Sequence, residues 1–162
     1  MNRDNFPETI NVIVEVPKGC RNKYEFDSSI NRIKLDRVLF SAVHYPADYG
    51  YVENTLAEDG DDVDVLVLIE EPTFSGCFIE ARPIGVLQMK DEKGIDNKIL
   101  AVPATDPVWN YVKDLHEIPP HLLTEIENFF LTYKKLEAKS VISDGWKSAA
   151  FAKEYLLSRK RF

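Results

Sequence analysis

Carboxylates crowd into one short segment of this sequence. Four of the six residues from Asp59 to Asp64 are aspartates, and an apolar run follows at once. Like charges packed this closely raise one another's pKa and repel unless cations lie among them. Hard divalent ions prefer oxygen ligands, and Mg²⁺ keeps waters that can bridge to a phosphate. The segment therefore predicts a metal site, although a solvated acidic turn is the alternative.

A second acidic turn follows about thirty residues later. Asp91 and Glu92 precede Lys93-Gly94, and Asp96 and Lys98 come directly after them. Alone, this is an ordinary hairpin turn on the surface. Together with the first turn it predicts carboxylates supplied from opposite sides of one cavity, because both turns fall at the ends of expected strands.

Two other metal motifs fit the first turn poorly. Asp59, Asp61 and Glu70 match positions one, three and twelve of an EF-hand loop. Val63 and Asp64, however, stand where that loop needs a ligand and a glycine, and no helix pattern follows. An Asp-x-Asp site of a nucleotide-sugar transferase would need a βαβ unit and a glycine-rich turn, which the chain lacks.

Basic residues occur at several expected strand ends. Lys23 and Glu25 share one face of a strand because side chains alternate across it. Glu15 lies just before Pro17 at another strand end, and Arg37 precedes an apolar run. A strand lysine taken alone is ordinarily a solvated edge residue.

Phenolic residues form a further set of candidates. Tyr45 and Tyr49 flank Pro46, and Tyr133 and Lys134 end the apolar pattern of an expected helix. Each of these tyrosines could simply be part of the core, and Lys134 could be solvated. His44 is likewise expected to be structural.

The charge balance excludes some functions. Lys and Arg number 20 and Asp and Glu 27, for a net charge of −7. Residues 38–81 contain ten carboxylates and no Lys or Arg, so this stretch should attract cations. A protein that binds nucleic acid by bulk electrostatics needs clustered Lys and Arg instead, so we expect no nucleic-acid partner.

Membranes and disulfides are not expected either. The longest unbroken apolar run is Val65–Ile69, too short for a membrane span or a signal peptide. Cys20 and Cys77 form no metal-binding pattern and no disulfide framework. These observations predict a cytoplasmic protein.

The elements that must position these residues follow from length and periodicity. The 162 residues, 44% hydrophobic, predict a single domain over 1–162. Alternating β-branched and aromatic residues predict six strands. These are Ile10–Val16, Lys23–Asp27, Ile30–Leu35, Asp64–Ile69, Phe78–Met89 and Lys98–Val102.

The last third of the chain shows a helical period. Apolar residues recur at three- and four-residue steps from Leu122 to Tyr133, after a Pro-Pro pair that suits a helix start. A shorter helix is predicted from Trp146 to Leu157, with Ser143 or Asp144 as its cap. Strands followed by helices indicate an α+β fold, a small closed or nearly closed β-barrel packed against two C-terminal helices.

These residues, taken in order, resemble a known family. The chain is similar to the soluble inorganic pyrophosphatases of the β-barrel type, of the shorter prokaryotic kind, from about Ile10 to the last helix. The features that carry the resemblance are Val14-Glu15-Val16-Pro17, Lys23-Tyr24-Glu25-Phe26-Asp27, Asp36-Arg37, Tyr45-Pro46, Tyr49-Gly50-Tyr51, Asp59–Val65, Asp91-Glu92 with Asp96 and Lys98, and Tyr133-Lys134. The resemblance implies a closed, OB-like five-stranded barrel with extra hairpins.

The resemblance also implies roles for individual residues. The general base would be Asp61, and the tightest metal would be held by Asp59, Asp64 and Asp96. Further metal positions would be served by Glu15, Asp91 and Glu92. The phosphates would be held by Lys23, Arg37, Tyr45, Lys98, Tyr133 and Lys134, while Glu25 and Tyr49 would line the site.

The activity implied by the resemblance is Mg²⁺-dependent hydrolysis of pyrophosphate to two orthophosphates. A metal-activated water would attack in line, and the reaction would drive biosyntheses that release pyrophosphate. Several Mg²⁺ ions would occupy each site, with Mn²⁺ or Zn²⁺ as substitutes, in a homohexamer. One departure is Asp62, which stands where the family usually has proline.

Two other functions remain open from the residues alone. A small OB-like barrel could use its acidic loops merely to hold a divalent ion, without catalysis. A metal-dependent enzyme could also act on organic phosphates such as nucleotides. An assay of phosphate release from pyrophosphate distinguishes a pyrophosphatase from the binding module. A panel of phosphate substrates distinguishes it from an enzyme that acts on organic phosphates.

Overall fold

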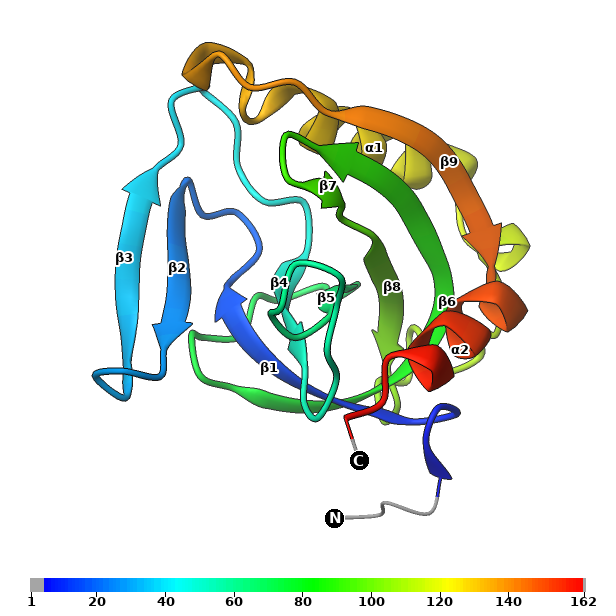
Figure 1. Ribbon diagram of the computed structural model, residues 1–162. Coiled ribbons are helices and arrows are strands. Elements are labelled where there is room, and N and C mark those ends of the chain that lie inside the picture. The colour runs from blue at the N-terminus through cyan, green and yellow to red at the C-terminus, as the bar shows by residue number, and fades with distance from the viewer. Residues whose placement is uncertain (1–4, 162) are drawn as a thin grey trace.

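The computed structural model describes residues 5–161 (Figure 1). The longer helices are α1 (Pro120–Thr132) and α2 (Ala149–Ser158), and η2 (Leu115–Glu117) and η3 (Lys135–Glu137) are short 3-10 turns. The strands are β1 (Ile10–Val16), β2 (Asn22–Asp27), β3 (Arg32–Val38), β4 (Asp48–Val52), β5 (Asp64–Val67), β6 (Phe78–Asp91), β7 (Gly94–Ile95), β8 (Lys98–Pro103) and β9 (Ile142–Ser148). No helix within the described range combines the length and hydropathy that crossing a membrane requires.

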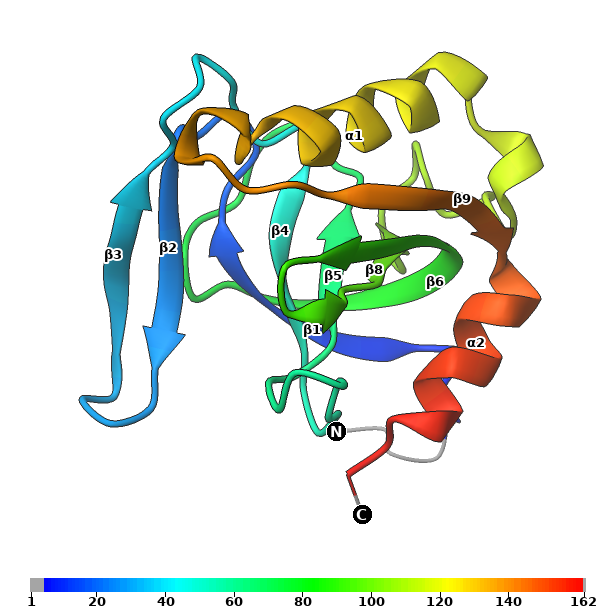
Figure 2. The same ribbon diagram turned by 45° about the horizontal axis from the view of Figure 1, so that its top comes forward.

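Five strands close into a barrel. Strand β1 pairs with β4, β4 with β5, β5 with β8 and β8 with β6, and β6 returns to pair with β1 (Figures 1 and 2). All of these pairings are antiparallel except that of β5 with β8. The long strand β6 also pairs with β7 and β9 outside this ring. The predicted α+β fold with a closed five-stranded barrel and extra hairpins is therefore confirmed.

Strand β5 is buried on both faces. Val65 and Val67 pack into a cluster that includes Ala152 and Leu156 of α2, whereas Leu66 packs into a second cluster under α1. A strand covered on both faces needs apolar residues at every position, which explains the continuous apolar run after Asp64. Strand β5 thus belongs to both apolar clusters of the molecule.

The β2–β3 hairpin is a separate two-stranded sheet. It stands beside the barrel, at the left of Figure 1. The backbone N–H of Phe26 donates to Glu15 at 2.7 Å, and the side chain of Arg37 reaches Glu137 at 2.8 Å. Polar contacts therefore help to join the hairpin to the barrel and to the segment after α1.

The expected strand and helix positions need three main corrections, besides the short strand β7, which was not predicted, and strand ends that differ by one or two residues. Strand β4 was not predicted, because Gly50 interrupts its alternating pattern. Strand β1 approaches this position so closely that a Cβ on residue 50 would lie 1.9 Å from the Ile13 carbonyl oxygen. The close approach therefore requires glycine. Strand β3 covers Arg32–Val38 rather than Ile30–Leu35. The predicted helix α1 and its proline start are confirmed.

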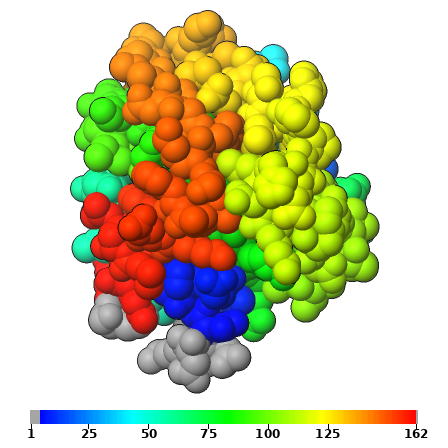
Figure 3. Space-filling view, turned by 90° about the vertical axis from the view of Figure 1, so that its right-hand side faces the viewer, coloured from blue at the N-terminus to red at the C-terminus, as the bar shows by residue number. Residues whose placement is uncertain are grey.

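The third correction concerns Trp146, which lies in β9 and not in a helix. It faces Leu87 in the β6–β9 ladder, and its Nε1 donates to the Leu123 carbonyl at 3.2 Å. Helix α2 begins only at Ala149, and its cap is Ser148 rather than Ser143 or Asp144. Figure 3 shows β9 in orange beside α1 in yellow, with α2 in red below it. Pairing with β6 overrides the helical period here.

Candidate functional site

One pocket, with a volume of about 920 Å³, opens between the barrel, the β2–β3 hairpin and the end of α1. Both acidic turns line it, as predicted. Eleven carboxylates and seven Lys or Arg side chains face it, so the wall carries excess negative charge. Of the predicted site residues, fourteen line the pocket: Glu15, Lys23, Glu25, Arg37, Tyr49, Asp59, Asp61, Asp64, Asp91, Glu92, Asp96, Lys98, Tyr133 and Lys134.

Tyr45 is the predicted site residue that does not line the pocket. It is 1% exposed, and its ring lies 5.1 Å from that of Tyr49 and 4.8 Å from that of Phe129, measured between centroids. Burial raises the pKa of its phenol. In this structure Tyr45 therefore packs behind Tyr49, as a core residue would.

Lys98 lies at the centre of the barrel side of the site. Parallel pairing of β5 and β8 places Asp64 opposite Lys98 at the first residue of each strand. The ammonium donates to Asp64 at 2.7 Å, to Asp96 at 2.9 Å and to the Tyr49 hydroxyl at 3.0 Å, and the Lys98 side chain is 2% exposed. Burial alone would lower the pKa of Lys98, but the two carboxylates outweigh it and hold that pKa well above its usual value.

Two neighbouring carboxyl groups resist ionisation. Burial raises the pKa of Asp96, and the Asp64 charge adds to this while Lys98 opposes it. Burial also raises the pKa of Glu15, to about 7, although the Phe26 N–H lowers it. Both shifts mean that this wall would accept further positive charge, since cations favour the ionised carboxylates.

The first acidic turn holds its aspartates out into the pocket. Gly60 has a φ of +91°, a conformation that suits glycine, and a Cβ there would meet no atom within 4 Å. The Asp61 N–H donates to Asp59 Oδ1 at 3.0 Å. Asp59 and Asp61 are exposed, and Asp62 lies 4.0 Å from Arg161.

The second acidic turn is held by the end of α1. Lys134 lies 3.3 Å from Asp91 and 3.8 Å from Glu92, and Lys139 lies 3.9 Å from Glu92. Burial opposes ionisation of Asp91, but the Lys93 N–H and the Lys134 ammonium hold its pKa below the usual value. The Lys134 side chain is 12% exposed, so the alternative of a solvated lysine is wrong.

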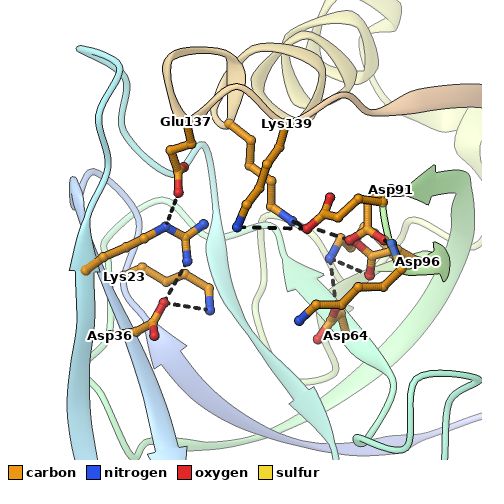
Figure 4. A network of polar contacts seen from close by, with 12 residues as sticks. Lys23, Asp36, Asp64, Asp91, Asp96, Glu137 and Lys139 are labelled. Carbon is orange, nitrogen blue, oxygen red and sulfur yellow. Dashed lines mark hydrogen bonds and ion pairs between the residues drawn. The ribbon is translucent and has the colours of Figure 1, made fainter.

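The hairpin supplies cations from the opposite side. Lys23 lies 3.3 Å from Glu25 and 3.5 Å from Asp36, which confirms that Lys23 and Glu25 share a face. Arg37 lies 2.6 Å from Asp36 and 2.8 Å from Glu137. Figure 4 shows the hairpin and barrel groups on two sides of the site.

Seven charged residues in or beside the pocket were not predicted to belong to the site: Asp27, Asp36, Asp62, Lys93, Glu137, Lys139 and Arg161. Asp36 directly precedes Arg37 in the sequence, and carboxylates beside a site arginine are common partners. Lys139 and Arg161 come from irregular segments and Glu137 from the short turn η3, where periodicity assigns no face. Asp36, next to a site arginine, therefore carried a usable signal in the sequence, whereas Glu137, Lys139 and Arg161 did not.

The donors of the pocket fit a hard divalent ion. Its acidic groups are all carboxylates, which suit Mg²⁺, and the excess of negative charge calls for cations. Within residues 5–161, however, no three Asp, Glu, His or Cys side chains converge closely enough to hold a metal. The Lys98 ammonium lies between Asp64 and Asp96 instead, so metal binding requires these side chains to rearrange.

Comparisons with known proteins agree with this site. The family profile for inorganic pyrophosphatase matches residues 12–161. The inorganic pyrophosphatase of Methanosarcina acetivorans is 55% identical over 149 residues, which cover 92% of this chain and 89% of that protein. That of Synechocystis is 54% identical over 85% of this chain and 82% of that protein.

Solved structures give the same result. The crystal structure of the Thermus thermophilus inorganic pyrophosphatase superposes with a TM-score of 0.94 at 44% identity, over 96% of this chain and 91% of that one. The Helicobacter pylori inorganic pyrophosphatase superposes with a TM-score of 0.91 at 41% identity, over 94% and 91%. The chain therefore belongs to the inorganic pyrophosphatase family.

Proposed function

We propose that this pocket hydrolyses inorganic pyrophosphate to two orthophosphates with the help of bound divalent cations. The observation that carries this is the division of charge around one pocket. Carboxylates of both acidic turns line the barrel side, while the hairpin side offers Lys23 and Arg37 beside carboxylates of its own. A small polyanion needs cations around it, and the carboxylates of the barrel side outnumber its Lys and Arg side chains, so this side needs bound metal to hold the substrate.

The cationic side chains would bind the phosphate oxygens. Lys23 and Arg37 line the pocket from the hairpin, and Tyr133 and Lys134 line it from the end of α1. Lys98 lies opposite the hairpin, on the barrel. Groups held this way fix the two phosphates relative to the attacking water, and positioning of this kind accounts for much of the rate in phosphoryl transfer. Glu25 and Tyr49 would order these groups.

The carboxylates would bind the metal. We assign the tightest ion to Asp59, Asp64 and Asp96, and further ions or their waters to Glu15, Asp91 and Glu92. Bound divalent ions would neutralise phosphate charge and lower the pKa of a water. Mg²⁺ is our choice because the ligands are carboxylate oxygens, with Mn²⁺ and Zn²⁺ as substitutes.

Asp61 is the residue we assign as general base. It lies on the exposed turn between Asp59 and Asp64, and within residues 5–161 its carboxylate enters no ion pair. A carboxylate without a cation partner is free to accept a proton from an attacking water. Neither cysteine nor serine is needed as a nucleophile on this route.

Matched aspartate variants test this proposal. Phosphate release from pyrophosphate with Mg²⁺ should fall by about 10²- to 10⁴-fold in Asp61→Asn, the usual worth of a general base. Asp62→Asn is the control, because it removes a charge from the same turn without removing an assigned ligand or base. Equal activity of the wild type and Asp61→Asn would contradict the assignment of the base. Binding of pyrophosphate and Mg²⁺ without phosphate release would instead indicate a binding module.

The surroundings of the enzyme belong to the same proposal. We assign a homohexamer of 18.6-kDa chains, by likeness to family members of this size, and light scattering gives the mass that checks it. A cytoplasmic location is supported by Cys20 and Cys77, which are free thiols. Removal of pyrophosphate would there drive biosynthetic reactions that release it.

A further inference from the structure

Glu137 is a buried carboxylate to which the chemistry above gives no role. It lies at the end of η3, the short turn that follows Tyr133 and Lys134. Its side chain is 7% exposed, and it does not itself line the pocket. Carboxylates are rarely buried unless a partner compensates their charge, so the partner of Glu137 indicates its purpose.

The partner of Glu137 is Arg37. Glu137 Oε1 lies 2.8 Å from Arg37 Nε, while Arg37 Nη1 lies 2.6 Å from Asp36 Oδ2. The Nε contact is an ion pair without hydrogen-bond alignment, and among residues 5–161 Glu137 Oε2 is buried with no hydrogen-bond partner. The charge of Glu137 is therefore compensated mainly by the guanidinium.

The contact joins two parts of the molecule that share no sheet. Arg37 lies on β3 in the two-stranded hairpin, and Glu137 lies in the segment that leads from α1 to β9. In Figure 4 Glu137 reaches down from that segment toward the hairpin. Ala138 follows with a φ of +56°, in the left-handed region that non-glycine residues avoid. Backbone held in this strained conformation often serves a site, and here it ends the turn directly after Glu137.

We infer that Glu137 is a positioning residue for the substrate-binding arginine. Glu137 and Asp36 engage Nε and Nη1 of Arg37 and leave Nη2 to bind a phosphate oxygen of pyrophosphate. Without Glu137 the guanidinium is tied only to Asp36, its neighbour on the same hairpin, and loses its fixed place relative to α1. The inference rests on the proposed function, since it assigns Glu137 to the same substrate.

Steady-state kinetics of Glu137→Gln test the inference. This variant keeps the size of the side chain and removes its charge. We expect kcat/KM for pyrophosphate to fall by about 10- to 100-fold, the effect of a small misplacement at a site, and mostly through a higher KM. Glu125→Gln is the control, because Glu125 is an exposed residue of α1 that pairs with His121 and should change neither constant.

A double-mutant cycle with Arg37→Ala separates positioning from a general loss of structure. In the Arg37→Ala background, adding Glu137→Gln should change kcat/KM by less than about twofold. Rates are referred to folded protein by thermal unfolding. If Glu137→Gln does not fold, Glu137→Asp carries the same test, because its shorter carboxylate keeps the charge but not the reach.

The outcomes distinguish the inference from the proposed function. A wild-type chain that releases no phosphate contradicts the proposed function. An active wild type together with an unchanged KM in Glu137→Gln overturns the positioning role. So does a cycle in which the effects of Arg37→Ala and Glu137→Gln multiply independently.

Discussion

Two lysines face the same pocket from very different surroundings. Lys98 begins a strand of the closed barrel, is 2% exposed and contacts two carboxylates at 2.7 and 2.9 Å. Lys23 lies on the separate hairpin, is 21% exposed and contacts two carboxylates at 3.3 and 3.5 Å. Both have the same chemistry, but only Lys98 is fixed by the register of neighbouring barrel strands.

The comparison indicates which side of the site contributes to stability and which to substrate binding. The barrel side is rigid because β5 is packed on both faces, so Asp64 and Lys98 are placed by the fold itself. The hairpin side is held by ion pairs, by the Phe26 N–H bond to Glu15 and by partly buried Tyr24, which packs against the core. Charges on the barrel should therefore matter to folding, and charges on the hairpin mainly to substrate binding.

The largest effect on stability should come from Lys98→Met. Removing this ammonium leaves Asp64 and Asp96 close together and partly buried without their cation. Breaking a buried ion pair in this way costs about 3 to 5 kcal/mol in the free energy of unfolding. Urea unfolding of the metal-free protein measures it, and a loss below about 1 kcal/mol would place Lys98 among ordinary surface pairs.

An intermediate effect should come from the pH dependence of Glu15, at the junction of barrel and hairpin. Its pKa is about 7 in the folded protein against 4.5 as the ordinary value. The folded state therefore keeps the proton that the unfolded state loses, and the resulting stability is present below pH 4.5 and disappears as the pH rises through 7. For the metal-free protein, the free energy of unfolding should fall by at most about 3 kcal/mol over this pH range.

Glu15→Gln provides the comparison for that pH dependence. Unfolding of the wild type and the variant in a chelator, from pH 4 to 8, should show the wild type losing stability relative to Glu15→Gln as the pH rises. Parallel curves would show that burial of Glu15 does not shift its ionisation.

The smallest effect on stability should come from Lys23→Met, the same substitution on the hairpin. Its ion pairs are partly exposed, so the free energy of unfolding should change by about 0 to 1 kcal/mol. The KM for pyrophosphate should nevertheless rise, because an assigned phosphate ligand is lost. Equal destabilisation by Lys23→Met and Lys98→Met would remove the distinction between the two regions.

The sequence predicted the regular parts of this molecule well. The apolar run after Asp64 and the alternation in Ile10–Val16 report local burial, which periodicity detects directly. Strand β4 was missed because the need for Gly50 depends on Ile13, a residue distant in the chain. Trp146 was assigned to a helix because its strand conformation depends on pairing with Leu87, which is also distant in the chain. Tertiary pairing of this kind produces no periodic pattern of apolar residues in the local sequence.

The candidate site likewise has residues that the sequence could predict and residues that it could not. The acidic turns were found because like charges in a row are unusual without a cation. Glu137 was not predicted, because a single glutamate after a helix is ordinarily solvated, and only the fold places Arg37 beside it. Tyr45 was predicted to belong to the site, with a place in the core as the alternative, and the structure buries it behind Tyr49.

Metal-dependent phosphate release from pyrophosphate tests the central claim most directly. The purified chain should release phosphate steadily with Mg²⁺, stop when a chelator exceeds the metal, and resume when Mg²⁺ is restored, while far-ultraviolet circular dichroism shows the fold unchanged throughout. Release that continues in excess chelator, or no release at any Mg²⁺ concentration, would contradict the assignment of the acidic barrel edge to divalent ions that serve hydrolysis.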